Sequence, residues 1–294
     1  KTTMKKVFIL FITVLSLSAM EPLVNGEWII KHVNDKNLVI IDVSNEEAFN
    51  EAHITNAVQS GLGKWRQSKG ESAYEIHSTK ELEDEIRRLG INNDTNVVVY
   101  AHNLDPIDLL TAPYVVWALE YLGLKNVAML DGGFDSYTNA GGKLCTKTTT
   151  KAKGDFKAKV NDAMLIDMQN VKKSIGKIKM VDSRPAKYYF GTDRQGILKR
   201  AGHITNAKSY SWQYSLNKDN TLKSKEVLSE TIENGMQLNK NDDLIIYCTG
   251  GLEAAMNYFV FHKVLGFKKA ALYDSSMLEW ANRDDTPMTK YRWE

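Results

Sequence analysis

The chain has 294 residues, of which 43% are hydrophobic, enough to build the core of one large domain or of two domains of ordinary size. Its 38 lysine and arginine residues nearly balance its 36 aspartate and glutamate residues. A chain so close to neutral has no broad electrostatic field for nucleic acid or anionic lipid, and we predict that it does not bind nucleic acid.

The first 20 residues carry the pattern of a secretory signal peptide. Met4, Lys5 and Lys6 precede the apolar run 7–15, and small residues follow at 16–19, where a signal peptidase could cut. The run is roughly half as long as the ~20 residues that a bilayer span needs. We therefore expect residues 1–20 to be a leader and the protein to be exported, to a periplasm, without a stable membrane anchor. A buried first helix is the alternative.

The next segment, residues 21–140, alternates short apolar runs with helical patterns. The run 97–100 is nearly continuously apolar, like the run 244–247 of the second half, which is typical of strands buried on both faces of a parallel sheet. Between 112 and 122 the apolar residues recur with helical spacing. This alternation predicts an α/β domain in which helices cover a mostly parallel sheet.

Residues 141–154 are rich in lysine, threonine and glycine, and we predict a solvated linker over residues 141–160. It contains Cys145, one of only two cysteines, the other being Cys248. Two cysteines exclude a disulfide framework, although in an oxidising compartment they could form one bridge and act as a redox switch. An unpaired linker cysteine is the simpler interpretation.

The second half of the chain repeats the first. The pentapeptide 53–57 recurs unchanged at 203–207, and the segment 122–131 is matched by 265–274. Further pairs follow in the same order: 38–43 with 178–183, and 96–100 with 243–247. The copies lie roughly 140 to 150 residues apart, too far for a solenoid repeat, so we predict a duplicated domain over residues 161–294.

The segment around Cys248 carries the strongest chemical signal. Cys248 directly follows the apolar run 244–247. After it come Thr249, two glycines and a helical pattern that begins at Leu252. In α/β sheets, reactive groups collect at the carboxyl ends of strands. The glycines let backbone N–H groups face the sulfur, and the helix start adds a positive dipole end. We expect a thiol with a lowered pKa and a persulfide held by the same donors; a buried structural cysteine is the alternative.

These features resemble the rhodanese superfamily over nearly all of the chain after the leader. Asp42 and His53 are similar to the first conserved segment of the family, and Asp182-Ser183-Arg184 with His203 is similar to its counterpart in the second domain of the tandem enzymes. The end of the chain, 280–287, resembles the closing segment of the family.

The resemblance implies two tandem rhodanese-like domains, each a mostly parallel sheet flanked by helices. The first, residues 21–140, is expected to be inactive because Ala101 stands where Cys248 stands in the second. Cys248 would take a sulfane sulfur as a persulfide and pass it to a thiophilic acceptor, which could be cyanide, a thiol or a protein thiol. No cofactor or metal is expected, since the cysteines and six histidines lack zinc-site spacing. His102, beside Ala101, is interpreted as a surface or packing residue.

The residues after Cys248 depart from both well-known branches of the family. Thr249 and Gly250 stand where the thiosulfate branch carries basic residues, and Gly250 also stands where the mercaptopyruvate branch carries a serine. Asp42 and His53 keep the spacing of the proton relay in the mercaptopyruvate branch. Because similar pairs recur in the second half, we favour a structural role for both.

The resemblance also suggests which residues contact substrate. Arg184 matches a substrate-binding arginine of the tandem enzymes, with a salt bridge at a strand end as the alternative, and Tyr188 replaces the second arginine of that site. We expect substrate contacts from Arg184 and from the loop residues Thr249, Gly250, Gly251, Leu252 and Glu253. A carboxylate facing the sulfur would repel a dianionic donor, so we expect Glu253 to point away or to pair with a basic residue.

Thiosulfate sulfurtransferase is the function that these residues favour. The alternatives are a 3-mercaptopyruvate sulfurtransferase and a non-catalytic carrier of persulfide or polysulfide sulfur. A phosphatase of similar fold is disfavoured, because Ala254 occupies the position at which such an enzyme carries its phosphate-binding arginine.

Overall fold

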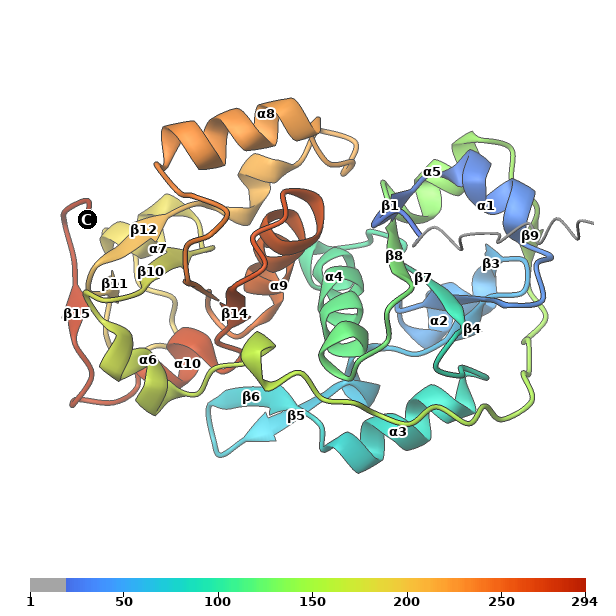
Figure 1. Ribbon diagram of the computed structural model, residues 1–294, viewed down its shortest axis with the longest axis horizontal. Coiled ribbons are helices and arrows are strands. Elements are labelled where there is room, and N and C mark those ends of the chain that lie inside the picture. The colour runs from blue at the N-terminus through green and yellow to red at the C-terminus, as the bar shows by residue number, and fades with distance from the viewer. Residues whose placement is uncertain (1–19) are drawn as a thin grey trace, which may run out of the picture.

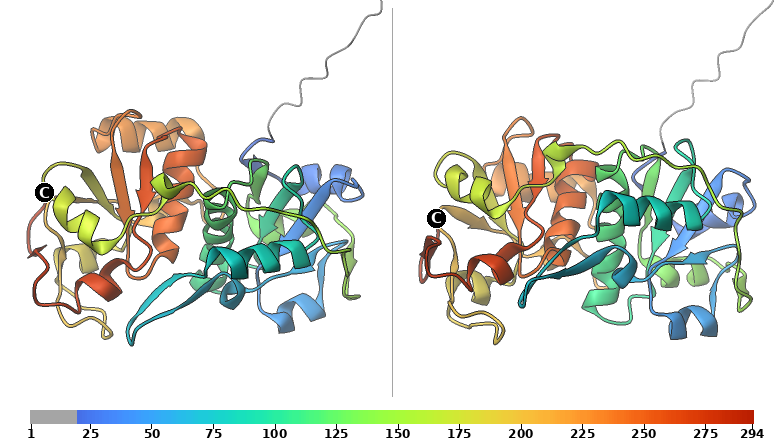
Figure 2. Two further views of the ribbon diagram at one scale, coloured as in Figure 1. Left: turned by 60° about the horizontal axis from the view of Figure 1, so that its bottom comes forward. Right: turned by 90° about the horizontal axis from the view of Figure 1, so that it is seen from below.

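The computed structural model describes residues 20–294. The predicted leader therefore lies, up to residue 19, outside the described residues. Two domains of similar build lie side by side along the longest axis of the molecule (Figure 2). Within residues 20–294, no helix is both long and apolar enough to cross a membrane.

The first domain is built on a five-stranded sheet with the order β1-β8-β7-β2-β4, and all of its neighbouring strands run parallel. The strands are β1 (Leu23–Val24), β2 (Leu38–Asp42), β4 (Val58–Gln59), β7 (Asn96–Tyr100) and β8 (Val127–Leu130). Its helices are α1 (Gly26–His32), α2 (Glu46–Glu51), α3 (Thr79–Arg88), α4 (Pro106–Tyr121) and α5 (Gly133–Asn139), with a short helical turn η1 (Leu62–Lys64).

The second domain is built on a four-stranded parallel sheet with the order β12-β10-β13-β14. The strands are β10 (Lys179–Asp182), β12 (Ala207–Ser209), β13 (Leu244–Tyr247) and β14 (Ala270–Leu272). Its helices are α6 (Met168–Ser174), α7 (Ala186–Phe190), α8 (Lys225–Ser229), α9 (Leu252–Tyr258) and α10 (Ser276–Trp280). Helical turns complete it at η2 (Asp162–Met164), η3 (Trp212–Ser215), η4 (Glu230–Gly235) and η5 (Phe259–Val264).

Both sheets are buried on both faces, as the continuous apolar runs predict. In β2, Val39 and Ile41 belong to one core, whereas Leu38 and Ile40 belong to another on the opposite face. Successive strand residues point to opposite faces, so an uninterrupted apolar run is what a sheet with helices on both sides requires. The prediction of α/β domains with helix-flanked parallel sheets is confirmed.

Equivalent contacts in the two domains show the duplication at the level of atoms. The backbone N–H of Ile54 donates to the Tyr100 hydroxyl at 3.1 Å, and the backbone N–H of Ile204 donates to the Tyr247 hydroxyl at 3.1 Å. The strand pairings agree as well, because β2 pairs with β7 as β10 pairs with β13. The repeat in the sequence therefore reflects a repeated packing arrangement.

Three small two-stranded sheets lie outside the main ones. They pair β3 (His53–Ile54) with β9 (Leu144–Cys145), β5 (Arg66–Lys69) with β6 (Ala73–Ile76), and β11 (His203–Ile204) with β15 (Met288–Thr289). The β5–β6 hairpin belongs to the first domain in sequence but reaches toward the second (Figure 1). This hairpin is not anticipated by the sequence pattern.

The segment between the domains is not a freely solvated linker. It runs across α3 and α4 of the first domain (Figure 1), where the backbone N–H of Gly154 donates to the Arg87 carbonyl and that of Lys159 to the Leu122 carbonyl. Phe156 within it is fully buried. Backbone pairing and one aromatic anchor therefore hold this segment against the first domain, which corrects the expectation of a solvated connection.

One hydrophobic core extends across the junction of the two domains. Helices α4 and α9 lie side by side there (Figure 1), and a single cluster of buried residues contains Leu110 and Val115 of α4 together with Ala255 and Tyr258 of α9. Because α9 begins directly after the Cys248 loop, this packing places the loop at the domain junction.

Candidate active site

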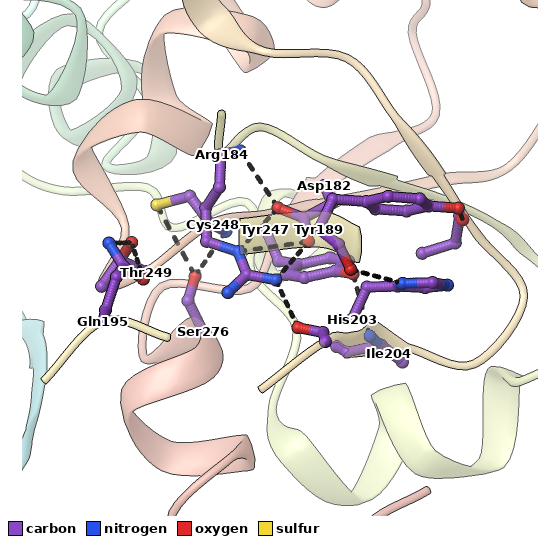
Figure 3. A network of polar contacts seen from close by, with 12 residues as sticks. Asp182, Arg184, Tyr189, Gln195, His203, Ile204, Tyr247, Cys248, Thr249 and Ser276 are labelled. Carbon is purple, nitrogen blue, oxygen red and sulfur yellow. Dashed lines mark hydrogen bonds and ion pairs between the residues drawn. The ribbon is translucent and has the colours of Figure 1, made fainter. Parts of the chain in front are cut away.

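Cys248 lies where the sequence predicts it, between the end of β13 and the start of α9. Its thiol is almost completely buried, with 1% of the residue exposed. The backbone N–H of Gly251 donates to the Cys248 sulfur at 3.1 Å, and the backbone N–H of Cys248 donates to the Ser276 hydroxyl at 3.0 Å (Figure 3). The N–H groups of Gly250 and Ala254 also act on the sulfur and favour its charged form. A cradle of backbone donors therefore surrounds the sulfur.

The second glycine of the loop is required by its surroundings. Gly251 has φ of 95°, in the region that favours glycine, and a Cβ there would lie 2.3 Å from the Asp274 carboxylate. The loop can therefore turn its Gly251 N–H toward the sulfur only because this residue has no side chain.

The pKa of Cys248 differs from the expectation. Burial, and next the negative charge of Glu253, raise the pKa of the Cys248 thiol to about 12, although the surrounding N–H groups act in the opposite direction. The predicted lowering of the pKa is therefore wrong. The local sequence showed the donors but not the depth at which the sulfur is buried, and desolvation of the thiolate is the larger effect.

The orientation of Glu253 also corrects an expectation. Its carboxylate turns back over the loop and accepts hydrogen bonds from the Thr249 hydroxyl at 3.0 Å and the Thr249 N–H at 3.3 Å. Burial raises the pKa of Glu253, and the positive charge of Arg184 acts against this. The charge of Glu253 thus acts on the Cys248 sulfur, and within the described part of the chain Glu253 forms no ion pair.

Gln195 joins the same group of side chains, although no sequence pattern points to it. Its side-chain amide donates to the Thr249 hydroxyl at 2.8 Å (Figure 3), and that hydroxyl in turn donates to Glu253. Gln195 belongs to the irregular segment after α7, far from Cys248 in the sequence. These three side chains form one connected chain of hydrogen bonds beside the sulfur.

Arg184 does not line the pocket in front of Cys248. Its guanidinium is 1% exposed, pairs with the Asp182 carboxylate at 2.6 Å and donates to the Gly202 carbonyl at 2.8 Å (Figure 3). Asp182 lies two residues earlier, at the end of β10. Its two carboxylate oxygens accept from Nε and Nη2 of Arg184, which makes the contact bidentate. The alternative interpretation, a salt bridge at a strand end, describes the observed geometry.

A pocket of about 480 Å³ opens in front of Cys248. Four of the predicted contact residues line it with the cysteine: Thr249, Gly250, Leu252 and Glu253. Gly251 acts through its N–H behind the sulfur, and Arg184 is not among the lining residues. Most of the remaining wall is apolar and comes from both domains, including Tyr74, Ile107, Leu110, Trp212 and Leu278.

Arg66 is the lining residue that connects the first domain to the loop. It lies in the β5–β6 hairpin, is 8% exposed, and donates from Nη2 to the Gly250 carbonyl at 2.6 Å. Its guanidinium lies over the rings of Tyr74 and Tyr114, at 4.3 and 5.3 Å from their centroids. Nothing in the sequence around Arg66 or Gly250 points to this contact, because it depends on how the two domains pack.

The corresponding loop of the first domain has a different composition. Ala101 stands in the place of the cysteine, and the His102 Nε2 lies 3.0 Å from the Asp42 carboxylate, while the ring stacks on Phe134 at 4.1 Å. His53 is buried, and its Nδ1 lies 2.7 Å from the Phe49 carbonyl. His102 and His53 thus hold the packing of the first domain, in agreement with the structural roles favoured for them.

Two further observations bear on cofactors and redox chemistry. Cys145 and Cys248 are both free thiols, and Cys145 lies in β9 on the outer side of the first domain (Figure 1). Residues 20–294 contain no cluster of three or more histidine, cysteine, aspartate or glutamate side chains suited to a metal ion.

Residues 25–140 and 166–283 each match the family model of the rhodanese-like domain. The chain therefore belongs to the rhodanese family, with two tandem domains, as the sequence predicts. Relatives named as sulfurtransferases or as a sulfur carrier match most of the chain. The protein is therefore a member of a sulfurtransferase family.

Three relatives illustrate the range of these names. A Synechococcus elongatus protein provisionally named a thiosulfate sulfurtransferase is 30% identical over 86% of this chain and 81% of its own. The Thermus thermophilus sulfur carrier protein TtuD is 28% identical over 92% of this chain and 97% of its own. The chicken (Gallus gallus) thiosulfate sulfurtransferase is 29% identical over 81% of each chain.

Solved structures share the fold at lower sequence identity. A complex of EanB with ergothioneine has a TM-score of 0.80 and 19% identity, covering 93% of this chain and 71% of its own. The structure of YnjE has a TM-score of 0.80 and 21% identity, and the match covers 92% of this chain and 68% of YnjE.

Proposed function

We propose that this protein is an enzyme that transfers a sulfane sulfur by carrying it on Cys248 as a persulfide, with thiosulfate as the donor. The observation that supports this most is the Cys248 sulfur itself, which faces a pocket and accepts the Gly251 N–H at 3.1 Å. The donors that hold this sulfur are equally suited to the negative charge of a persulfide.

In the first half-reaction, the Cys248 sulfur attacks the outer sulfur of thiosulfate. The S–S bond of thiosulfate breaks, its electron pair leaves with sulfite, and the thiol proton passes to that sulfite. In the second, an acceptor attacks the outer sulfur of the persulfide and Cys248 is released. Because the pKa of Cys248 is raised, removal of its proton is expected to limit the first half-reaction near neutral pH.

The donor is inferred from relatives such as the chicken enzyme, whose name specifies thiosulfate. 3-Mercaptopyruvate is the less favoured donor, because Arg184, which would bind its carboxylate, is paired with Asp182. The Glu253 carboxylate beside the pocket opposes any dianion. We therefore expect thiosulfate to bind weakly, with a KM well above that for an uncharged donor.

Mass spectrometry tests the persulfide directly. After incubation with thiosulfate, 3-mercaptopyruvate or polysulfide, the Cys248 peptide should gain about 32 Da, the mass of one sulfur atom. Cys145→Ser is the matched control and should load normally, whereas Cys248→Ser should not. Full turnover by Cys248→Ser would rule out the proposed mechanism.

A non-catalytic sulfur carrier is the second candidate, favoured by the likeness to the Thermus sulfur carrier protein. An enzyme releases many sulfur atoms per Cys248 in a cyanide assay, whereas a carrier releases about one before it stops. Counting thiocyanate formed per protein molecule separates the two. We favour the enzyme because the pocket gives small molecules direct access to the loop.

We also propose that the protein is exported to a periplasm, on the basis of the leader pattern in residues 1–20. Cell fractionation with N-terminal sequencing of the product tests this. Recovery of the intact leader on cytosolic protein would contradict it.

A further inference from the structure

The space in front of Cys248 continues beyond the catalytic loop. A second cavity, of about 430 Å³, lies against the β5–β6 hairpin of the first domain. Arg66, Tyr74, Ile107 and Leu252 line both this cavity and the pocket at Cys248, so the two are adjoining parts of one space. Each part alone is in the size range of sites for organic ligands, about 300–1,000 Å³, and far exceeds what cyanide or sulfite would fill.

The walls of this space carry little charge for an anion to use. Among the described residues that line the two cavities, Arg66 and Glu253 are the charged ones. The Arg66 guanidinium already donates to the Gly250 carbonyl and lies over two tyrosine rings, and the Glu253 carboxylate already accepts from Thr249. The formal charges of these two side chains sum to zero, so the walls offer a small anion no net positive charge beyond the backbone N–H groups around the Cys248 sulfur.

Large apolar side chains are left uncovered where the two cavities meet. Ile107 is 59% exposed and Tyr74 is 42% exposed, although both line the active-site space. Contiguous exposed apolar groups beside a cavity are typical of ligand-binding grooves. A ligand with an apolar body would cover both side chains and gain the free energy of removing them from water.

From these observations we propose that the second cavity is an acceptor subsite, and that the acceptor is an organic thiol with an uncharged apolar body. The body binds between Ile107, Tyr74 and the hairpin, and the thiol reaches the persulfide on Cys248. This inference rests on the proposed function and specifies its second substrate.

The transfer step balances without any further reagent. The acceptor sulfur attacks the outer sulfur of the Cys248 persulfide, a new S–S bond forms, and the bond between that sulfur and Cys248 Sγ breaks. The proton of the acceptor thiol ends on Cys248 Sγ, and an organic persulfide anion leaves. No oxidant or reductant is consumed, since sulfane sulfur passes from one thiol to another.

The acceptor class is tested with protein whose Cys248 persulfide has been loaded beforehand. We would measure loss of the persulfide with 2-phenylethanethiol and 3-mercaptopropionate, alkyl thiols that differ in body and charge, and with sulfite. The phenyl thiol should react with a kcat/KM at least about tenfold above that of 3-mercaptopropionate, the effect expected from burying its ring. Equal or faster reaction with 3-mercaptopropionate or sulfite would overturn the proposal.

The location of the subsite is tested by filling it. Ser68 lines the second cavity and shares a face of the hairpin with Arg66, two residues before it, and with Tyr74, its partner across the strands. Ser68→Phe should raise the KM for 2-phenylethanethiol at least about tenfold and change the reaction with cyanide by less than about twofold. Ser72→Phe, at the exposed turn of the same hairpin, is the matched control and should behave as the unmodified protein does.

A binding measurement separates failure of this inference from failure of the proposed function. 2-Phenylethyl methyl sulfide cannot accept sulfur as a thiol does, so its binding can be followed by calorimetry whether or not Cys248 forms a persulfide. Binding that Ser68→Phe weakens and Ser72→Phe does not would support the subsite even if no persulfide formed. Absence of binding, or equal binding to both variants, would overturn it.

Discussion

The surroundings of Cys248 shift the pKa of its thiol in two opposite directions. Backbone N–H groups, with Gly251 at 3.1 Å, favour the thiolate, while burial and the carboxylate of Glu253 favour the neutral thiol. Burial and the charge of Glu253 have the larger effect, since the pKa of Cys248 is raised to about 12. The resting site is therefore a protonated thiol, and the N–H cradle takes effect when negative charge develops on the sulfur.

The charge of Glu253 can be tested separately from its hydrogen bonds. Glu253→Gln keeps an oxygen that accepts from Thr249 but removes the negative charge, so the pKa of Cys248 should fall. Thiolate is the reactive form, and we expect alkylation of Cys248 by iodoacetamide at pH 7 to accelerate by about tenfold for each pKa unit lost.

The pH profile gives the sign of this effect. In the unmodified protein the alkylation rate should rise with pH through the whole range from about 7 to 10, because the thiol stays below its pKa there. In Glu253→Gln the profile should shift to lower pH. Superimposable profiles would show that Glu253 does not act on the sulfur through its charge.

Arg184 forms a buried ion pair with Asp182 and does not line the pocket at Cys248. Arg184→Lys keeps the charge but loses the two-pronged geometry toward Asp182, and we expect the free energy of unfolding to fall by about 1–3 kcal/mol. The KM for thiosulfate should change by less than about twofold, since the guanidinium does not line the pocket. Urea unfolding and steady-state kinetics of the same sample measure both. A large rise in KM at unchanged stability would restore the substrate-binding role.

Among the structural elements, the β5–β6 hairpin of the first domain contacts the Cys248 loop directly. It supplies Arg66 to the Gly250 carbonyl, and its Tyr74 carbonyl accepts from the Ser275 hydroxyl of the second domain at 2.9 Å. Lys69 of the same hairpin lies 3.1 Å from Glu279. A domain whose own loop carries Ala101 in place of a cysteine thus contacts the loop that carries Cys248.

Arg66 is a positioning residue, and its removal should lower kcat more than it changes KM. Losing a buried hydrogen bond from a charged donor costs about 1.5–3 kcal/mol, so Arg66→Met should lower kcat by about tenfold to a hundredfold. Arg66→Lys should recover part of that loss. Lys69→Met removes a positive charge from the same hairpin without touching the loop, and its kcat should stay within about twofold. Equal losses in both methionine variants would mean that the hairpin acts only through stability.

The elements show where sequence reasoning succeeds and where it stops. The strands around 97–100 and 244–247, the helix around 112–122, the helix that starts near Leu252 and the internal repeat follow from local patterns, because burial on two faces leaves a continuous apolar run. Arg66 and Gln195 could not be predicted in the site, since each meets the Cys248 loop only through tertiary packing. The pKa of Cys248 was missed for the same reason, as burial depends on residues distant in the sequence.

At the scale of the whole molecule, the two domains behave as one structural unit. The hydrophobic core continues through α4 and α9, and Asp274 of the second domain accepts from the Ile76 N–H at 2.7 Å and the Tyr114 hydroxyl at 3.0 Å, both of the first. Burial raises the pKa of Asp274 to about 6, while the charge of Arg66 opposes this. A shared core and a shared buried carboxyl predict a single cooperative unfolding transition.

Asp274 should make the stability of the molecule depend on pH in a direction unusual for a carboxyl group. Because its pKa is about 6 when folded and about 3.9 when unfolded, the folded state binds the extra proton between these values, and stability falls as pH rises from about 4 to 6. Asp274→Asn keeps an oxygen for Ile76 and Tyr114 but removes the titration. Urea unfolding of both proteins at several pH values should therefore show the variant gaining, relative to the parent, on the order of 2–3 kcal/mol between pH 4 and 7. Parallel curves would contradict the raised pKa, whereas two separate transitions would contradict the shared core.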